Sequence, residues 1–271
     1  MTSIAGLTDP GHRAGENQDS IGWDAARSLA FVADGLGGHA SGQVASGIVK
    51  QSLLDPVDTS NLGAAALRAH AAIVQAAEKE DHLHGMASTL VAAQIVSRVA
   101  QIVWVGDSRA YLWRGGAISR LTRDHSLVEE LRELTPLSET QVRVHPQRNA
   151  VTNVLGAGTP VPSMAEIPLR KGDWILLCSD GLSGELRDEA IAVVLASALS
   201  PADAAERLIA AALAAGGHDN VSAVIVKYDG PSKRDLWLKL DEGAVGWLAV
   251  LGGVVLAVLL ASLVMWIRHK R

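Results

Sequence analysis

The sequence predicts an α+β domain, in which helices cover antiparallel β-sheet, followed by one membrane-spanning helix. Three observations lead to this prediction. Short apolar runs typical of strands dominate the middle of the chain, and several follow one another closely, which favours antiparallel pairing. Helical periodicity occurs in two separate blocks, unlike the regular alternation of a βαβ protein. A long segment without charged residues stands near the C-terminus.

Strands are expected where apolar residues alternate or run continuously, at 29–33, 88–96, 101–105, 110–113, 173–178 and 221–226. Helices are expected at 42–54, 62–80, 126–134, 188–199 and 202–215, three of them rich in alanine. Pro201 suits the first turn of the last helix, and Ser200 suits its N-cap. One folded domain is therefore expected to span residues 1–228.

Residues 244–267 carry no charge, and a helix of this length can cross the roughly 30 Å of a bilayer core. Trp247 and Trp266 stand near its two ends, where indole rings favour the headgroup region. We expect a linker at 229–243, a transmembrane helix at 244–267 and a basic tail at 268–271. A buried core helix is the alternative. Lys and Arg are balanced on the two sides, so they do not decide the orientation.

Composition excludes several classes of protein. A net charge of −5 argues against a nucleic-acid partner, which would need clustered Lys and Arg. The one cysteine, Cys178, stands in an apolar run, so no disulfide framework is possible and a buried thiol is expected. The first ten residues lack the basic start and apolar stretch of a secretory signal, so the domain is expected in the cytosol.

Five aspartates stand directly before or after apolar strands, where loops can bring side chains into one cleft: Asp19, Asp34, Asp107, Asp180 and Asp219. Because no lysine stands nearby, such a cluster would repel itself without bound cations. Mg²⁺ and Mn²⁺ prefer carboxylate, backbone carbonyl and water ligands. Any single Asp-Gly pair is better explained as an ordinary turn, but the five aspartates together predict a divalent metal site.

Seven short motifs follow one another between Thr8 and Val226. They are Asn17-Gln18-Asp19-Ser20, Ala33-Asp34-Gly35-Leu36-Gly37-Gly38-His39, residues 85–89, Val105-Gly106-Asp107-Ser108-Arg109, residues 121–126, Ser179-Asp180-Gly181 and Asp219-Asn220-Val221-Ser222. Each motif alone is a weak signal of a protein family, but all seven in this order are highly specific. The chain resembles the metal-dependent protein phosphatases, the PPM or type 2C family, and its bacterial members in particular.

The resemblance implies two antiparallel β-sheets packed as a sandwich flanked by helices, in α-β-β-α layers, with the metal ions at one end. It implies that Asp34 bridges two ions, that Gly35 binds one through its backbone carbonyl, and that Asp180 and Asp219 hold the other. Asp19 would act through water. Asp107 would form a third, looser site with Asp180. Two or three Mn or Mg ions are therefore expected, and water activated by two metals would attack phosphorus in line.

The arginine with which many relatives contact substrate phosphate has no counterpart at the same position in this chain. Many relatives carry it five residues before the counterpart of Asp19, where this chain has Ala14. Arg13, one residue away, is the candidate, because its planar guanidinium suits phosphate. A solvated surface charge fits Arg13 equally well. Arg109 is the reserve candidate, although packing is its expected role.

Several neighbouring residues are expected to be structural. Leu36 stands where some relatives have a histidine proposed as general acid, so a water would have to protonate the leaving group. His39 is expected at a helix start, and Asp124 with His125 is expected to cap and position the following helix. Residues 134–149 fall where the family carries a flap beside the active site.

The expected function is hydrolysis of phosphoserine and phosphothreonine on proteins, reversing a cognate serine/threonine kinase. A catalytically silent membrane-anchored scaffold is the alternative from another class, but loss of a metal aspartate would signal it and none is lost. A phosphatase dedicated to one regulatory protein is a third possibility. The expected location is the inner or plasma membrane, with a single span and the catalytic domain in the cytoplasm.

Overall fold

The computed structural model describes residues 1–12, 15–38, 41–55, 61–135, 137–143 and 145–230. The chain divides into two units, Met1–Gly230 and Pro231–Arg271. The second unit lies outside the described residues, and with it the predicted transmembrane helix, its basic tail and all but the first two residues of the linker. Among the described residues, none of the helices combines the length and hydropathy of a bilayer-crossing segment.

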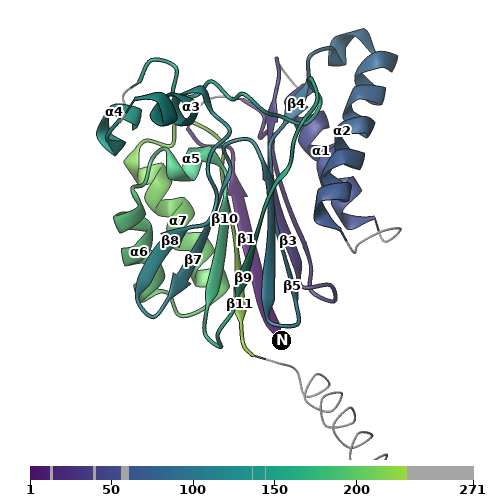
Figure 1. The fold of residues 1–271 in the computed structure, drawn as a ribbon. Coiled ribbons are helices and arrows are strands. Elements are labelled where there is room, and N and C mark those ends of the chain that lie inside the picture. The colour runs from purple at the N-terminus through teal and green to yellow at the C-terminus, as the bar shows by residue number, and fades with distance from the viewer. Residues whose placement is uncertain (13–14, 39–40, 56–60, 136, 144, 231–271) are drawn as a thin grey trace, which may run out of the picture. The chain divides into compact units, whose positions relative to one another are not determined.

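Two antiparallel sheets form the centre of the first unit (Figure 1). One has the strand order β1-β11-β10-β7-β8, and the other has the order β2-β3-β5-β6-β9 with β4 paired to β3. The strands are β1 Thr2–Asp9, β2 Asp19–Asp24, β3 Leu29–Leu36, β4 Ala87–Ser88, β5 Leu90–Val96, β6 Val99–Val105, β7 Arg109–Arg114, β8 Ala117–Arg120, β9 Ser163–Pro168, β10 Trp174–Cys178 and β11 Val221–Tyr228.

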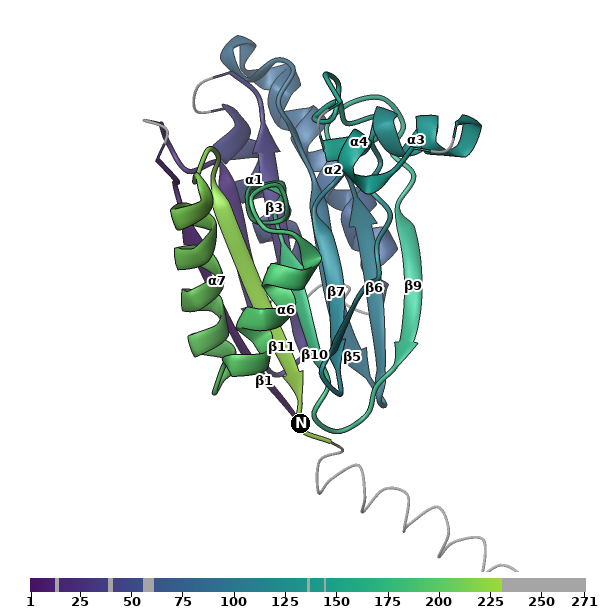
Figure 2. The same ribbon diagram turned by 90° about the vertical axis from the view of Figure 1, so that its left-hand side faces the viewer.

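Helices cover the outer face of each sheet. α1 and α2 lie on the sheet that contains β3, and α6 and α7 lie on the sheet that contains β11, as two perpendicular views show (Figures 1 and 2). The helices are α1 Ser41–Leu54, α2 Leu62–Lys79, the 3-10 helix η1 Asp81–Leu83, α3 Leu127–Leu134, α4 Glu139–Arg143, α5 Asp180–Ser183, α6 Asp188–Ser197 and α7 Pro201–Ala215.

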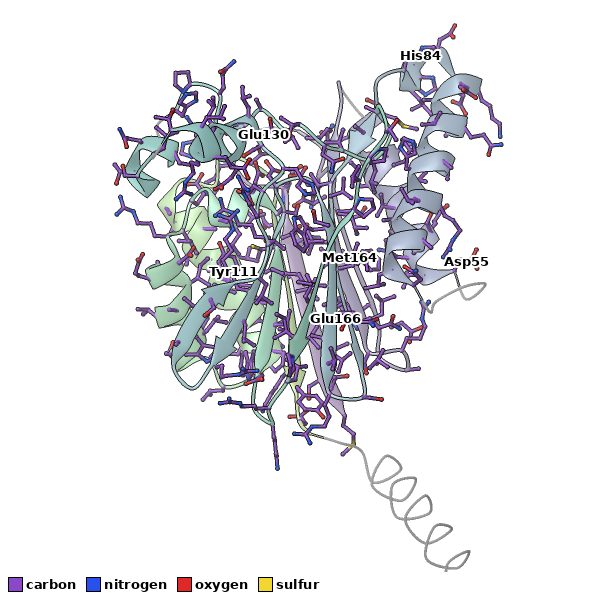
Figure 3. The ribbon with its side chains drawn as sticks, in the orientation of Figure 1. Asp55, His84, Tyr111, Glu130, Met164 and Glu166 are labelled. Carbon is purple, nitrogen blue, oxygen red and sulfur yellow. The ribbon has the colours of Figure 1, made fainter. Side chains whose placement is uncertain are left out.

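Three apolar cores lie between these layers. Val32 and Ile102 of one sheet meet Leu177 and Val224 of the other in the central core. The alternate side chains of the same strands face outward and form a second core with α1 and α2, and a third with α5, α6 and α7. Tyr111 belongs to this third core, on the outer face of its sheet (Figure 3). Because each sheet is buried on both faces, its central strands are apolar throughout, and the expected α-β-β-α sandwich is confirmed.

All six predicted strands are present, as β3, β5 with the short β4, β6, β7, β10 and β11. The five predicted helices are present within two residues at each end. The predicted cap is confirmed, since the Ser200 hydroxyl accepts a hydrogen bond of 3.2 Å from the backbone N–H of Asp203. Strands β1, β2, β8 and β9 were not predicted. They lie at sheet edges, where side chains are only partly buried and the apolar pattern is weak.

Candidate metal centre

A cavity of about 280 Å³ opens at one end of the sandwich, where strands β3, β6 and β10 end and strand β11 begins. Four of the predicted aspartates and the predicted glycine meet there although they come from four separate segments. The lining residues are Gln18, Asp34, Gly35, Leu36, Gly37, Asp107, Asn149, Val151, Asp180, Asp219 and Asn220. The structure therefore brings together Asp34, Gly35, Asp107, Asp180 and Asp219, as the motifs predicted.

Asp19 lies directly opposite Asp34 on the neighbouring strand. Side chains of such a pair share one face of the sheet at close range, and two like charges in this position destabilise the pairing. Asp19 is 7% exposed, and within the described part of the chain neither of its carboxylate oxygens has a hydrogen-bond partner. The nearby hydroxyl of Ser222 donates to Thr8 instead, over 2.7 Å.

Backbone contacts hold Asp34 and Gly35 in place. The N–H of Asp34 donates to the Thr89 hydroxyl over 3.0 Å, and the N–H of Thr89 donates back to the Asp34 carbonyl over 2.8 Å. A Cβ atom on Gly35 would lie 2.0 Å from the carbonyl oxygen of Gly42, in the first turn of α1. Only glycine fits this close approach, which brings the helix start against the cavity.

The carboxyl groups of the cavity carry raised pKa values. Burial, and then the charges of Asp19, Asp180 and Asp107, raises the pKa of Asp34 well above its ordinary value. Burial and the charge of Asp180 do the same for Asp107, and burial with Asp219 raises the pKa of Asp180. Burial also raises the pKa of Asp19 to about 7, against the smaller opposing effect of Ser222 and Ser179. Divalent cations would relieve this shared repulsion.

The donor set fits hard divalent cations. Among the described residues, neither lysine nor arginine lines this cavity, and the two buried carboxylate oxygens of Asp19 have no hydrogen-bond partner. Within the described residues, no three His, Cys, Asp or Glu side chains are arranged to hold one ion unaided. Backbone carbonyl oxygen and water would therefore have to complete the coordination, which is usual for Mg²⁺.

The loop that carries Asp219 is held by contacts that the sequence did not reveal. Glu185 accepts hydrogen bonds from the backbone N–H of His218, over 3.1 Å, and from its ring Nδ1, over 2.7 Å. The side chain of Asn220 accepts from the N–H of Gln18 over 2.8 Å and donates to the carbonyl of Pro10 over 3.0 Å. These contacts join the two ends of the domain sequence beside Asp219.

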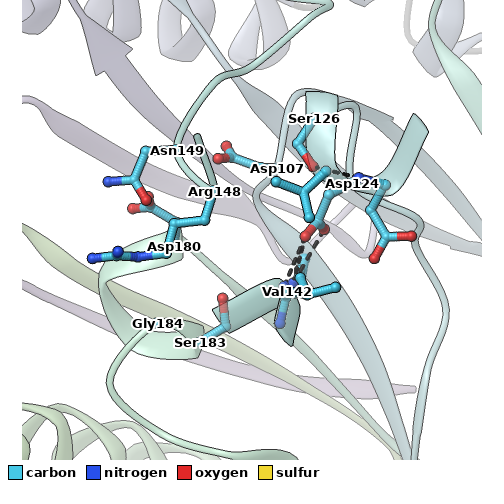
Figure 4. Close-up of a pocket in the computed structure, with 12 residues that line it drawn as sticks. Asp107, Asp124, Ser126, Val142, Arg148, Asn149, Asp180, Ser183 and Gly184 are labelled. Carbon is cyan, nitrogen blue, oxygen red and sulfur yellow. Dashed lines mark hydrogen bonds and ion pairs between the residues drawn. The ribbon is translucent and has the colours of Figure 1, made fainter. Parts of the chain in front are cut away.

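A second, smaller cavity of about 110 Å³ shares Asp107 and Asp180 with the first (Figure 4). Arg109 also lines this cavity, but its guanidinium forms an ion pair with Asp124, with Nη2 and Oδ2 2.7 Å apart. The predicted packing role therefore describes Arg109 better than a role in phosphate binding. Arg148 and Asn149 also line this cavity. Among the described residues, no hydrogen bond or ion pair of the Arg148 guanidinium is found, which leaves it available to an anion.

The capping role expected of Asp124 and His125 was only partly right. Ser126 is the N-cap of α3, because its hydroxyl accepts from the N–H of Glu129. Asp124 instead binds Arg109 and Arg120, and the His125 ring bonds the Ser163 hydroxyl over 2.9 Å. Both residues therefore position the loop before α3 and do not cap the helix. Arg13 and His39 lie outside the described residues.

Comparison with known proteins identifies the family. The profile of the protein phosphatase 2C family matches residues 12–215. Serine/threonine protein phosphatase PstP of Mycobacterium tuberculosis is 37% identical over 235 residues, which cover 83% of this chain and 45% of PstP. Protein phosphatase PhpP of Streptococcus pneumoniae is 33% identical over 236 residues, covering 82% of this chain and 96% of PhpP. The chain thus spans less than half of one relative and nearly all of the other.

A solved structure extends the comparison to the fold. The catalytic domain of PstP in complex with two manganese ions superposes with a TM-score of 0.76 at 33% identity, over 83% of this chain and 97% of that one. The resemblance inferred from the seven motifs is confirmed, and with it the sandwich fold. The chain belongs to the protein phosphatase 2C family.

Proposed function

We propose that this protein removes phosphate from serine and threonine side chains of other proteins, with Mn or Mg ions bound at the larger cavity. One observation carries the proposal: aspartates from four separate segments converge on that cavity, and the buried Asp19 opposite Asp34 has no hydrogen-bond partner among the described residues. Such an arrangement is costly to the fold unless cations bind, so its presence favours an active enzyme over a silent scaffold.

We assign the ligands as follows. Asp34 would contact two ions and the Gly35 carbonyl one of them, while Asp180 and Asp219 would hold the other. Asp19 would act through water, and Asp107 would contribute with Asp180 to a third site. The manganese-bound relative and the lining of the cavity support this assignment.

When bound, a pair of divalent cations supplies the charge that activates a water and neutralises the phosphoryl oxygens. The protein's own residues hold the metal-binding aspartates in place and orient the substrate. Thr89 fixes the backbone of Asp34, and Glu185 fixes the loop of Asp219. Arg148, whose guanidinium has no ion pair with any described residue, lines the smaller cavity and is placed to contact the phosphate, as Arg13 was expected to be. Burial raises the pKa of Cys178 to about 12, so this thiol is no nucleophile.

The test is metal-dependent hydrolysis of a phosphothreonine peptide. Asp34→Ala and Asp219→Ala should each lose activity, on the order of 100-fold or more. Asp81→Ala, which removes an exposed carboxylate of η1, is the matched control and should leave the rate unchanged. Equal rates with Mn²⁺ and with excess chelator would refute the mechanism.

We also propose that residues 229–243 link the domain to a transmembrane helix at 244–267 and that residues 268–271 form a basic tail. The catalytic domain would lie in the cytoplasm, where it would reverse the action of a cognate kinase. The eight residues of β11 separate the loop of Asp219 from the start of this linker. At about 3.3 Å per residue, that strand keeps the cavity about 26 Å from the attachment point. Protease accessibility in intact cells and in inverted vesicles tests the orientation, and digestion of the domain in intact cells would overturn it.

A further inference from the structure

The chain leaves the domain at the end of the sandwich that lies opposite the metal centre. Strand β11 begins beside Asp219 and ends at Tyr228, and the N-terminus lies at this same far end (Figures 1 and 2). The Met1 amine donates to the Gly230 carbonyl, and the Asp229 N–H donates to the Met1 carbonyl over 2.9 Å. We call this the basal end. It comprises residues 1, 24–28, 55, 96–99, 114–117, 168–173 and 227–230.

Positive charge gathers at the basal end of an otherwise acidic protein. The chain carries a net charge of −5, but the basal end holds six Arg or Lys side chains and four Asp side chains. Three of these cations already form ion pairs with aspartates of the same end. Arg27 pairs with Asp24 at 2.6 Å, Arg114 pairs with the buried Asp173 at 2.6 Å, and Lys227 lies 3.7 Å from Asp229, which the Ser3 hydroxyl also contacts.

The other three cations, Arg98, Arg170 and Lys171, are exposed, and no ion pair of theirs is found among the described residues. They lie close together although they come from two different turns. The Arg98 carbonyl accepts from the N–H of Leu169 over 2.8 Å, which joins the β5–β6 hairpin to the β9–β10 turn. The Lys171 side chain passes over Gly230, with its Cγ and Cδ atoms 3.6 Å from where a Cβ would stand.

Exposed apolar side chains accompany these cations. Val96, two residues before Arg98, is 47% exposed, and Met1 is 63% exposed. Cations interspersed with apolar side chains suit the headgroup region of a bilayer, where the charge meets lipid phosphates and the apolar groups reach the acyl boundary.

We infer that the basal end docks on an anionic bilayer surface through Arg98, Arg170 and Lys171, and so holds the metal centre facing away from the membrane. The inference extends the proposed membrane attachment, but it concerns residues of the domain itself. Docking of this kind would limit tilting of the domain and leave the substrate cavity open to the aqueous phase.

The experiment uses residues 1–230, which hold both sheets and all three cores, and whose counterpart in PstP was crystallised as a catalytic domain. Co-sedimentation with phosphatidylcholine vesicles is compared with vesicles that also contain phosphatidylglycerol. Binding is expected only to the anionic vesicles, and raising the salt from 0.05 M to about 0.5 M should abolish it.

The variants identify the surface. Each cation near an anionic surface strengthens binding about fivefold, so Arg98→Gln with Lys171→Gln should weaken it about 30-fold. Lys79→Gln with Arg187→Gln removes the same charge from exposed positions away from the basal end, and should leave binding unchanged. Both double variants should hydrolyse a soluble phosphopeptide at the normal rate, which shows that they fold.

Equal vesicle binding by the two double variants would overturn the inference, as would binding of the unaltered domain to neutral vesicles or to none. Failure of the phosphatase proposal would instead show as absent hydrolysis with vesicle binding intact. In the full-length protein reconstituted into nanodiscs, amide exchange of the β9–β10 turn should be slower with phosphatidylglycerol than without it. Equal exchange rates would also count against docking.

Discussion

Asp19→Asn is expected to stabilise the metal-free protein at pH 8, although it removes a residue of the proposed centre. Burial raises the pKa of Asp19 from 3.8 to about 7, and both carboxylate oxygens lack partners. At 1.36 kcal/mol per pH unit, ionising this group in the folded state costs about 4 kcal/mol relative to the unfolded chain. Asn removes the charge while keeping the shape, so about 2–4 kcal/mol should be recovered, since Asp34 and Asp180 remain.

The pH dependence gives the sign of the effect. Because the folded pKa lies above the unfolded value, the unfolded chain releases this proton first as the pH rises. Stability contributed by protonated Asp19 is therefore present below about pH 4, is lost between about pH 4 and 7, and stays lost at pH 8. The advantage of Asp19→Asn should therefore be absent near pH 4, grow between about pH 4 and 7, and be fully present at pH 8.

Thermal unfolding in excess chelator measures this effect. For a domain of this size, about 3 kcal/mol corresponds to a Tm increase of about 6–12 °C. Asp81→Asn removes an exposed carboxylate and serves as the control, with an unchanged Tm. With saturating Mn²⁺ the order should reverse, because the unaltered protein binds the ions better. A Tm for Asp19→Asn at or below that of the unaltered protein at pH 8 without metal would refute the reasoning.

Three further substitutions test the contacts around the cavity. Glu185→Ala should raise the Mn²⁺ concentration for half-maximal activity about tenfold and weaken Mn²⁺ binding in calorimetry, because His218 loses two hydrogen bonds; Glu185→Gln should largely restore both. Thr89→Val keeps the side-chain shape but leaves the buried N–H of Asp34 unpaired, so the free energy of unfolding in urea should fall by about 1–3 kcal/mol. Arg148→Ala should raise KM for a phosphopeptide about tenfold with a smaller change in kcat, and Arg148→Lys should recover only part of it. An unchanged KM would exclude Arg148 from phosphate contact.

The parts of the fold that could be predicted are those in which one local signal dominates. β10 and β11 are buried on both faces and read as continuous apolar runs, and α7 has both a proline at its first turn and a serine cap. β1 and β9 could not be recognised in the same way. Each pairs along only one side, and its side chains alternate between partly buried and exposed, so composition says little about it.

The site shows the same division. The aspartates could be predicted because each stands in a short motif with a glycine or small residue whose backbone role is local. The supporting contacts could not, because they join distant positions. Glu185 and His218 are 33 residues apart, and the Asn220 side chain contacts Gln18 across 202 residues. Arg148 carries no local signal at all, and only the fold places it beside Asp180 (Figure 4).

The metal centre also bears on the stability of the whole domain. Asp19, Asp34, Asp107 and Asp180 all carry raised pKa values for the same first reason, burial, and each raises the cost of ionising another. The apolar cores on either side of both sheets must offset this cost when the ions are absent. Ion binding removes it, so metal affinity and folding stability are thermodynamically linked. A core substitution that leaves much of the metal-free domain unfolded should therefore also raise the metal concentration that the enzyme requires, even though it touches no ligand.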